Sequence, residues 1–434
     1  MAKSLADRVR ARHFHSWCRQ QLVAYRQKIP GQGGGMFGTM VDNVISGVKR
    51  KQIPFGLRHL AAHQWRLAHR SRSSSQRTSP STDRTIESPT SSLSEESSPM
   101  PTLTSKLFCA VATFVIALAG TCVHAAGFQH GFAADPDGKP LVIGIWYPSQ
   151  ATVQPLVMGP TTMSVAINGI AQGKALPLVV MSHGAASSFL SHFDTAIALA
   201  DAGFVVAAIT HPGDNYADQS RSADIMDRPR QISRVIDHML STWDGRAMID
   251  AARIGMFGFS AGGFTTVVSI GGIPDFSKVG PMCLQHPGDY ACQLIAKSGG
   301  NRAVPLTTTT DRAADLRIKA AVVVAPALGF TFSPDGLKNV KLPMQLWRAE
   351  NDVLVPHPRY AEAVRLALPQ TPEYHVVPNA GHYDFMVPCG AALASMVPTI
   401  CTSAVGFDRA AFHASFNEAV VGFLNKTLKA GSGT

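Results

Sequence analysis

The feature that most constrains the fold of this chain is a serine framed by glycines, Gly258-Phe259-Ser260-Ala261-Gly262. An apolar run at 254–257 leads into it, and small and apolar residues follow at 263–268. This order predicts a strand, a sharp turn and a helix, because flanking glycines let a strand and a helix approach closely. Such a turn lifts the serine hydroxyl above the sheet, where it can act as a nucleophile. A glycine-rich turn without chemistry is the alternative, and the downstream sequence decides between them.

Strand-like apolar segments alternate with helical ones from about residue 127 onward. The predicted strands are 141–147 (ended by Pro148), 176–181, 204–210, 254–257, 318–325, 344–348 and 374–377, and the predicted helices are 192–202, 228–241, 261–270 and 408–427. Near-continuous apolar strands alternating with helices indicate a mostly parallel central sheet with helices on both faces. Residues 269–316 break the pattern and are expected to form a small inserted cap over the site. A surface loop without a role in binding is the alternative.

A base and an acid for the serine are expected at the ends of two later strands. Asp352 follows the predicted strand 344–348, and His382 follows the predicted strand 374–377. The carboxyl ends of parallel strands meet at one edge of the sheet, where ligands bind. Ser260, Asp352 and His382 are therefore expected to act together as nucleophile, acid and base. Glu350 and Asp335 are alternatives for the acid; Asp352 is preferred because it lies at the turn before Val-Leu-Val-Pro.

Acyl transfer also needs backbone donors for the developing oxyanion. The first is expected to be the N–H of Ala261, directly after the nucleophile, and the second the N–H of Ala185, in the loop after an early strand. His183 in that loop, and His211 and Asp214 after the next strand, are expected at the rim of the site. Simple turns held by glycine and proline are the alternative explanation for these residues.

These motifs resemble the α/β-hydrolase superfamily, in particular predicted dienelactone hydrolases and platelet-activating-factor acetylhydrolase-like esterases. The resemblance spans residues 127–427 and rests on Ile145-Trp146-Tyr147-Pro148, Ser182-His183-Gly184, His211-Pro212-Gly213-Asp214, Arg228-Pro229, Gly258-Phe259-Ser260-Ala261-Gly262-Gly263 and Gly381-His382-Tyr383-Asp384-Phe385. It implies an α/β-hydrolase fold and an esterase with Ser260, Asp352 and His382 as its triad. Dienelactone hydrolases use a cysteine nucleophile, so Ser260 points instead to ordinary carboxylic esters.

The expected function is cleavage of a small-molecule carboxylic ester through an acyl-enzyme. A serine peptidase or an acyltransferase on the same scaffold is an alternative, because acyl-enzyme formation is common to all three. A non-catalytic binding protein of the same fold is a second alternative, and it would normally have lost a member of the triad. The sequence has no zinc-like pairing of His or Cys and no phosphate-binding glycine motif, so neither a metal nor a cofactor is expected. Acyl chain length, alcohol group and oligomeric state cannot be read from the sequence.

The basic charge of the chain is confined to its first 99 residues. They contain 16 Lys and Arg against 6 Asp and Glu, whereas residues 100–434 contain 23 of each, so the whole net charge of +10 lies at 1–99. Residues 71–99 hold 12 serines and almost nothing apolar, a composition that predicts disorder. The catalytic portion gives no indication of a nucleic-acid partner.

A secretory signal peptide is expected at 100–126. Met100 and Lys106 precede an apolar run at 107–120, and residues 123–126 resemble a cleavage site. The run is shorter than the roughly 20 apolar residues of a membrane span. Translation is therefore expected to start at Met100, with 1–99 an upstream extension of the gene model. The mature domain, 127–434, would then be periplasmic or secreted and would have no stable span. The alternative is a cytoplasmic basic tail on a signal anchor.

Four cysteines follow the predicted signal peptide. An even number of cysteines in an exported protein indicates disulfides. The pairing that closes the shortest loops joins Cys283 to Cys292 and Cys389 to Cys401. Four free thiols in a reducing compartment are the alternative.

Overall fold

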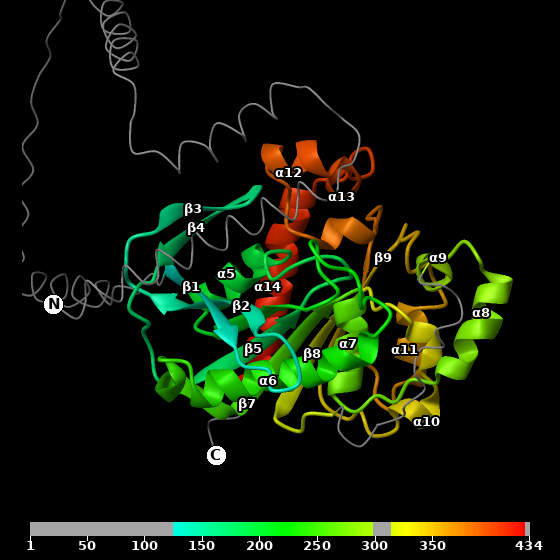
Figure 1. Cartoon of the computed structure of the whole chain (residues 1–434), viewed down its shortest axis with the longest axis horizontal. Helices are drawn as coiled ribbons and strands as arrows, with labels where there is room; N and C mark the ends of the chain where they lie inside the picture. The colour runs from blue at the N-terminus through cyan, green and yellow to red at the C-terminus, as the bar shows by residue number, and fades with distance from the viewer. Residues whose placement is uncertain (1–124, 298–313, 430–434) are drawn as a thin grey trace, which may run out of the picture. The chain divides into compact units, whose positions relative to one another are not determined.

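The computed structural model describes residues 125–297 and 314–429, which fall within one contact unit, Leu103–Thr434 (Figure 1). The predicted extension at 1–99 lies outside the described residues. So does the predicted signal peptide at 100–126, apart from Ala125 and Ala126, with which the first strand begins. Part of the predicted cap, 298–313, is likewise outside them.

A ten-stranded sheet crosses the domain in the order β10-β9-β8-β7-β5-β6-β2-β1-β4-β3. Six neighbouring strands are parallel: β10 (Glu373–Val377), β9 (Met344–Ala349), β8 (Ile318–Val324), β7 (Ile249–Phe259), β5 (Leu176–Ser182) and β6 (Val205–Thr210). β2 (Leu141–Ser149) lies antiparallel to both β6 and β1 (Ala125–Ala133). β4 (Thr161–Ile167), which runs parallel to β1, and β3 (Gln154–Met158) form a hairpin at the edge of the sheet.

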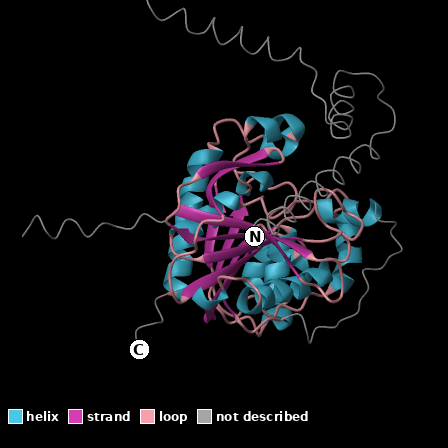
Figure 2. Ribbon diagram, turned by 60° about the vertical axis from the view of Figure 1, so that its left-hand side comes forward, coloured by secondary structure: helices cyan, strands magenta, loops and turns pink. Residues whose placement is uncertain are grey.

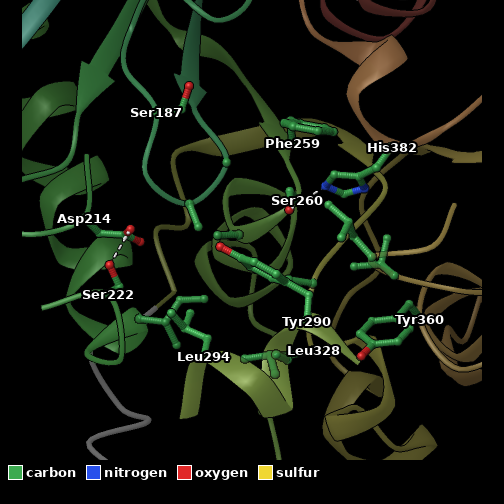
Figure 3. Close-up of a pocket in the computed structure, with 18 of the residues that line it drawn as sticks. Ser187, Asp214, Ser222, Phe259, Ser260, Tyr290, Leu294, Leu328, Tyr360 and His382 are labelled. Carbon is green, nitrogen blue, oxygen red and sulfur yellow. Dashed lines mark hydrogen bonds between the residues drawn. The ribbon is translucent and has the colours of Figure 1, made fainter. Parts of the chain in front are cut away.

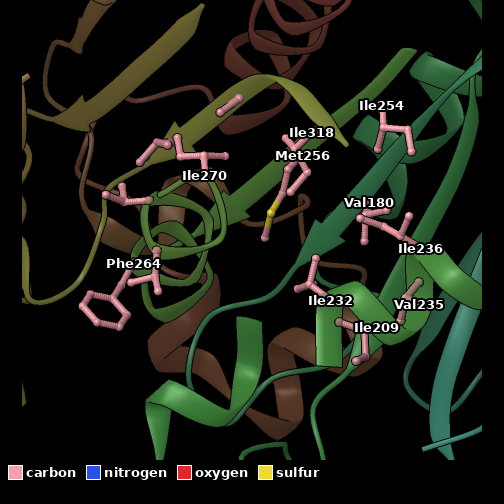
Figure 4. Packing of buried hydrophobic residues seen from close by; sticks show 14 of the residues in the cluster. Val180, Ile209, Ile232, Val235, Ile236, Ile254, Met256, Phe264, Ile270 and Ile318 are labelled. Atoms are coloured by element: carbon pink, nitrogen blue, oxygen red, sulfur yellow. The ribbon is translucent and has the colours of Figure 1, made fainter. Parts of the chain in front are cut away.

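Helices cover both faces of this sheet (Figure 2). One face packs against α6 (Arg228–Ser241), α7 (Ala261–Ser269) and α11 (Ala361–Ala367), and the other against α5 (Phe193–Asp201) and α14 (Arg409–Leu428). Side chains alternate between the two cores, as the pleat of a strand requires. In β5, for example, Leu178 and Val180 join the first core, and Val179 and Met181 join the second. Figure 4 shows the first core, where Val180 of β5 and Ile232 of α6 belong to one buried cluster.

The α/β fold class expected from the sequence is confirmed: a mostly parallel central sheet carries helices on both faces, as in α/β-hydrolases. One boundary differs, because β2 continues through Pro148 to Ser149. The Pro148 carbonyl faces away from β1 and accepts from the Gln172 N–H, and β6 pairs only with residues 142–146. The missing N–H of the proline therefore costs no ladder bond.

Between α7 and β8 the chain leaves the regular alternation, as expected. The described part of this segment holds η5 (Phe276–Lys278), α8 (Val279–Gln285) and α9 (Tyr290–Lys297). The disulfide Cys283–Cys292 joins α8 to α9. The second disulfide, Cys389–Cys401, encloses α12 (Ala391–Met396) and α13 (Pro398–Cys401). Both are the pairs with the shortest loops. No helix in the described ranges has the length and apolarity needed to cross a membrane.

Candidate active site

Ser260 occupies a strained turn between β7 and α7. Its φ of 57° and ψ of −115° lie in a region that residues other than glycine rarely adopt. Three backbone hydrogen bonds hold this conformation. The Ser260 N–H donates to the Val324 carbonyl, and the Ser260 carbonyl accepts from the N–H groups of Phe264 and Ala327. The sharp turn predicted at this serine is therefore present, with the hydroxyl outside the helix it begins.

The glycines of the motif permit close backbone contact. A Cβ at Gly258 would stand 2.1 Å from the Gly262 carbonyl oxygen. A Cβ at Gly262 would stand 1.9 Å from the carbonyl oxygen of Ser182, at the end of β5. Any side chain at either position would push α7 away from the strands, so these two glycines set the height of Ser260 above the sheet.

Ser260, His382 and Asp352 form a continuous chain of hydrogen bonds. His382 Nε2 lies 3.0 Å from Ser260 Oγ (Figure 3). His382 Nδ1 lies 2.7 Å from Asp352 Oδ2. Since a carboxylate only accepts, Nδ1 carries the proton and donates to Asp352, which leaves Nε2 to accept from the serine hydroxyl. His382 begins η8 (His382–Phe385) after β10, and Asp352 follows β9. Three loops at the carboxyl edge of the sheet thus bring the three groups together.

The structure distinguishes the three candidate acids. Asp352 is buried and bonds His382, and its Oδ1 accepts from the N–H groups of Leu354 and Val355. Burial raises the pKa of the Asp352 carboxyl, but His382 and the two backbone donors outweigh burial, so the pKa lies below its ordinary value. Glu350 instead accepts from the Asn379 N–H, and Asp335 pairs with Lys338.

The two expected oxyanion donors lie beside Ser260. Ala185 and Ala261 both line the pocket that contains Ser260 and His382. A Cβ on Gly184, the residue before Ala185, would stand 3.4 Å from Ser260 Cβ. The loop 182–185 therefore lies directly against the turn that carries Ser260. Within residues 125–297 and 314–429, neither of these N–H groups forms a hydrogen bond. Both are therefore free to bind a developing negative charge.

Three residues predicted at the rim lie behind this loop, in a buried polar network. Arg228 of α6 donates to the His183 carbonyl at 2.7 Å and pairs with Asp214 at 2.5 Å. Asp214 also accepts from the Ala186 N–H at 3.0 Å, and His183 Nε2 accepts from the His211 N–H at 3.0 Å. The network fixes the backbone that carries Ala185. Of the three predicted residues, only Asp214 also lines the pocket.

The two histidines of this network are neutral. Burial, followed by the positive charge of Arg228, lowers the pKa of His183 to about 3 and that of His211 well below its ordinary value. His211 donates from Nδ1 to Gln231 Oε1 and accepts at Nε2 from the Ser182 hydroxyl. Each ring thus has a fixed tautomer and a structural partner, so neither is available as a base.

A second network supports the turn that carries His382. Asp384, two residues later, accepts from the Gly381 N–H at 2.8 Å and from Arg409 Nε at 3.0 Å. His413 of α14 contacts the Asp384 carbonyl through Nε2 at 2.9 Å and Asp194 through Nδ1 at 2.6 Å. These contacts tie the turn to α14 and α5. In the sequence, Asp384 and Arg228 contribute only to the family resemblance. Only the tertiary structure shows that Asp384 pairs with Arg409 and Arg228 with Asp214.

The pocket above Ser260 is mainly apolar. Sequence segments far apart supply its walls: Ile225 before α6, Leu328 after β8, Tyr383 and Met386 after β10, and the segment 276–297. The expected cap segment contributes Phe276, Val279, Tyr290, Ala291, Leu294 and Ile295. Its described part therefore forms one wall of the pocket. Among the residues that the structure describes, no group of three or more His, Cys, Asp or Glu could hold a metal ion.

No protein-family model matches the chain, and no curated protein does. Among solved structures, the chain is similar to a ferulic acid esterase from Streptomyces cinnamoneus, with 19% sequence identity and a TM-score of 0.48. The alignment covers 72% of this chain and 92% of that one.

Proposed function

We propose that this protein is a serine hydrolase that cleaves small-molecule carboxylic esters through an acyl-enzyme intermediate. The observation that carries the proposal is the unbroken chain from Ser260 through His382 to Asp352, with the serine on a strained turn and facing a pocket. A binding protein would have no need of a strained nucleophile with its base and acid in place.

In the proposed reaction, Ser260 Oγ attacks the ester carbonyl carbon while His382 Nε2 takes the hydroxyl proton. Asp352 holds the imidazole in the correct tautomer and stabilises the imidazolium. The N–H groups of Ala261 and Ala185 bind the oxyanion of the tetrahedral intermediate. His382 then gives the proton to the leaving alcohol, and the acyl group stays on Ser260. Water attacks this acyl-enzyme with the same base, releasing the acid and the free serine.

The site also agrees with a reaction that needs neither a metal nor a cofactor, because the triad and the two backbone donors supply every proton transfer and charge contact of ester cleavage.

We further propose that the domain acts outside the cytoplasm. The two disulfides are compatible with an oxidising compartment.

The test is hydrolysis of p-nitrophenyl esters from acetate to palmitate by the full chain and by Ser260→Ala. We expect the substitution to lower kcat by several orders of magnitude with an unchanged melting temperature, because only residual catalysis survives the loss of the nucleophile. An organophosphonate should label Ser260 in the unaltered protein only. Equal ester hydrolysis by the two proteins would overturn the proposal.

A further inference from the structure

Two tyrosines in the pocket, Tyr290 and Tyr383, have hydroxyl groups without a hydrogen-bond partner among the described residues. Tyr290, the first residue of α9, lines the pocket with Ser260 and His382. Across residues 125–297 and 314–429, the structure contains no hydrogen bond to its hydroxyl. The neighbouring Tyr360 differs in this respect, because its hydroxyl donates to Asp289 at 3.0 Å.

The position of Tyr290 is fixed from both sides. The preceding residue, Asp289, accepts from Arg359 at 2.9 Å and from the Tyr360 hydroxyl. Two residues after Tyr290, the disulfide Cys283–Cys292 holds α9 against α8. A side chain between two such anchors is preorganised, so its hydroxyl needs little ordering to bind a ligand.

The Tyr290 hydroxyl is suited to donate. Tyr290 is 39% exposed, and the partial burial of its ring raises its pKa above the ordinary value, with the negative charge of Asp214 adding to that effect. The hydroxyl therefore stays protonated. Most of the remaining pocket wall in this region is apolar, with Ile225, Leu294 and Leu328 among its residues. A donor among apolar groups selects ligands by where they carry an acceptor.

The direction of the side chain identifies the part of the ester it meets. In Figure 3 Tyr290 extends across the pocket with its hydroxyl directed toward the wall that carries Asp214, while His382 lies on the other side of Ser260. His382 hands its proton to the leaving alcohol, so the alcohol must lie on the His382 side. The acyl group then occupies the side where Tyr290 and Leu294 stand.

We propose that Tyr290 is a specificity-determining residue, and that the preferred substrates are esters whose apolar acyl chain carries an acceptor oxygen (ether, hydroxyl or carbonyl) bound by the Tyr290 hydroxyl. The inference rests on the proposed ester hydrolysis at Ser260. It assigns to the segment 276–297 the recognition of the acyl group as well as the enclosure of the pocket.

The experiment compares the full chain with Tyr290→Phe on p-nitrophenyl hexanoate and on ether analogues in which one methylene, at position 3, 4 or 5, is replaced by oxygen. Every substrate has the same leaving group, so differences report the acyl side. For the ether analogue whose oxygen reaches Tyr290, we expect the substitution to lower kcat/KM about fivefold to tenfold, the effect of one neutral hydrogen bond. For hexanoate we expect the two proteins to agree within about twofold.

Tyr216→Phe is the matched control, since Tyr216 is also an exposed tyrosine but lies outside the pocket. It should leave the ratio of kcat/KM between ether and carbon chains unchanged. Equal losses on all chains in Tyr290→Phe, or no loss on any, would overturn the assignment of Tyr290 while ester hydrolysis stands. If the unaltered protein hydrolyses none of the esters, the failure lies with the proposed function.

Discussion

The carboxyl edge of the sheet and the segment 276–297 both face the pocket, but they are held in place in different ways. Ser260, Asp352 and His382 follow β7, β9 and β10. β7 and β9 flank β8, which is buried at every position except Lys319, and β10 is the edge strand beside β9. The segment, in contrast, contains α8, which has no buried residue, and Leu284 on it is 86% exposed. The contacts of Asp289 with Arg359 and Tyr360 fasten it to the rest of the domain, and the disulfide Cys283–Cys292 joins its two helices to each other.

This difference suggests a division of tasks. Groups that must keep an exact hydrogen-bond geometry stand on strand ends, whose positions are fixed by two packed cores. The proposed acyl-binding wall stands on a few fastened residues that can change without disturbing those cores. Substitutions at the sheet edge should therefore reduce activity toward all esters, whereas changes in the segment should alter the preference among them.

The largest effect is expected at Asp352, the proposed acid of the triad at the sheet edge. Asp352→Asn should keep the fold and lower kcat by about 10⁴-fold, because an amide would hold His382 in the wrong tautomer. Glu350→Gln, in the same loop but bonded to the Asn379 N–H, is the matched control and should change kcat little. Steady-state kinetics on p-nitrophenyl butyrate measure both. A crippled Glu350→Gln with a nearly normal Asp352→Asn would show that the acid is misassigned.

The next effect concerns Arg228, which supports the oxyanion loop, the residues 182–185 that carry the Ala185 N–H. Arg228→Met should destabilise the fold by about 3–5 kcal/mol, because it leaves the buried Asp214 without its cation. The double change Arg228→Met with Asp214→Asn should recover part of that loss, since no unpaired charge remains. Urea denaturation gives the free energies of unfolding. If the double variant is no more stable than Arg228→Met alone, the pair does not act as described.

A smaller effect should distinguish the two disulfides by their influence on the acyl-chain preference. Replacing Cys283 and Cys292 by serine releases α8 from α9 and should change the ratio of kcat/KM between short and long acyl esters severalfold. Replacing Cys389 and Cys401 by serine is the control, because no residue from 389 to 401 lines the pocket. The acyl-chain series from acetate to palmitate measures both variants. If only the variant at Cys389 and Cys401 changes the preference between short and long acyl esters, the assignment of the acyl group to the segment 276–297 is wrong.

The smallest effect concerns the change of the free energy of unfolding with pH. Burial lowers the pKa of His192 to about 3, whereas an unfolded histidine titrates near about 6.5. Between these values the unfolded chain binds a proton that the native protein does not, so stability falls as pH falls. His192→Phe, packed between Phe257 and Phe259, should reduce this slope by about 1.4 kcal/mol per pH unit.

Urea denaturation at pH 7, 6 and 5 measures the slopes for both proteins. His183 and His211 contribute the same sign of pH dependence to each, so the difference isolates His192. Equal slopes in the unaltered protein and in His192→Phe would contradict the lowered pKa of His192.

Several site residues could be predicted from local sequence because their roles follow from their place after a strand. The motif at 258–262 needs glycines where backbones touch, and His382 and Asp352 each follow an apolar strand, so the order of motifs along the chain suggested the same site. The strands β1, β4 and β3, which form the other end of the sheet, had no comparable signal. β3 and β4 form an edge hairpin with many exposed positions, and exposed strands lack the continuous apolar runs of buried ones.

The sequence by itself determined the α/β class, the elbow serine and the disulfide pairs with the shortest loops, because strand periodicity, turn chemistry and short-range spacing are local properties. Only the tertiary structure decided which carboxylate reaches His382, and that Arg228 pairs with Asp214 behind the oxyanion loop. It alone placed Tyr290 in the same pocket as Ser260 and His382. These contacts join residues distant in sequence, and their partners depend on how the loops pack at one sheet edge, which no local pattern encodes.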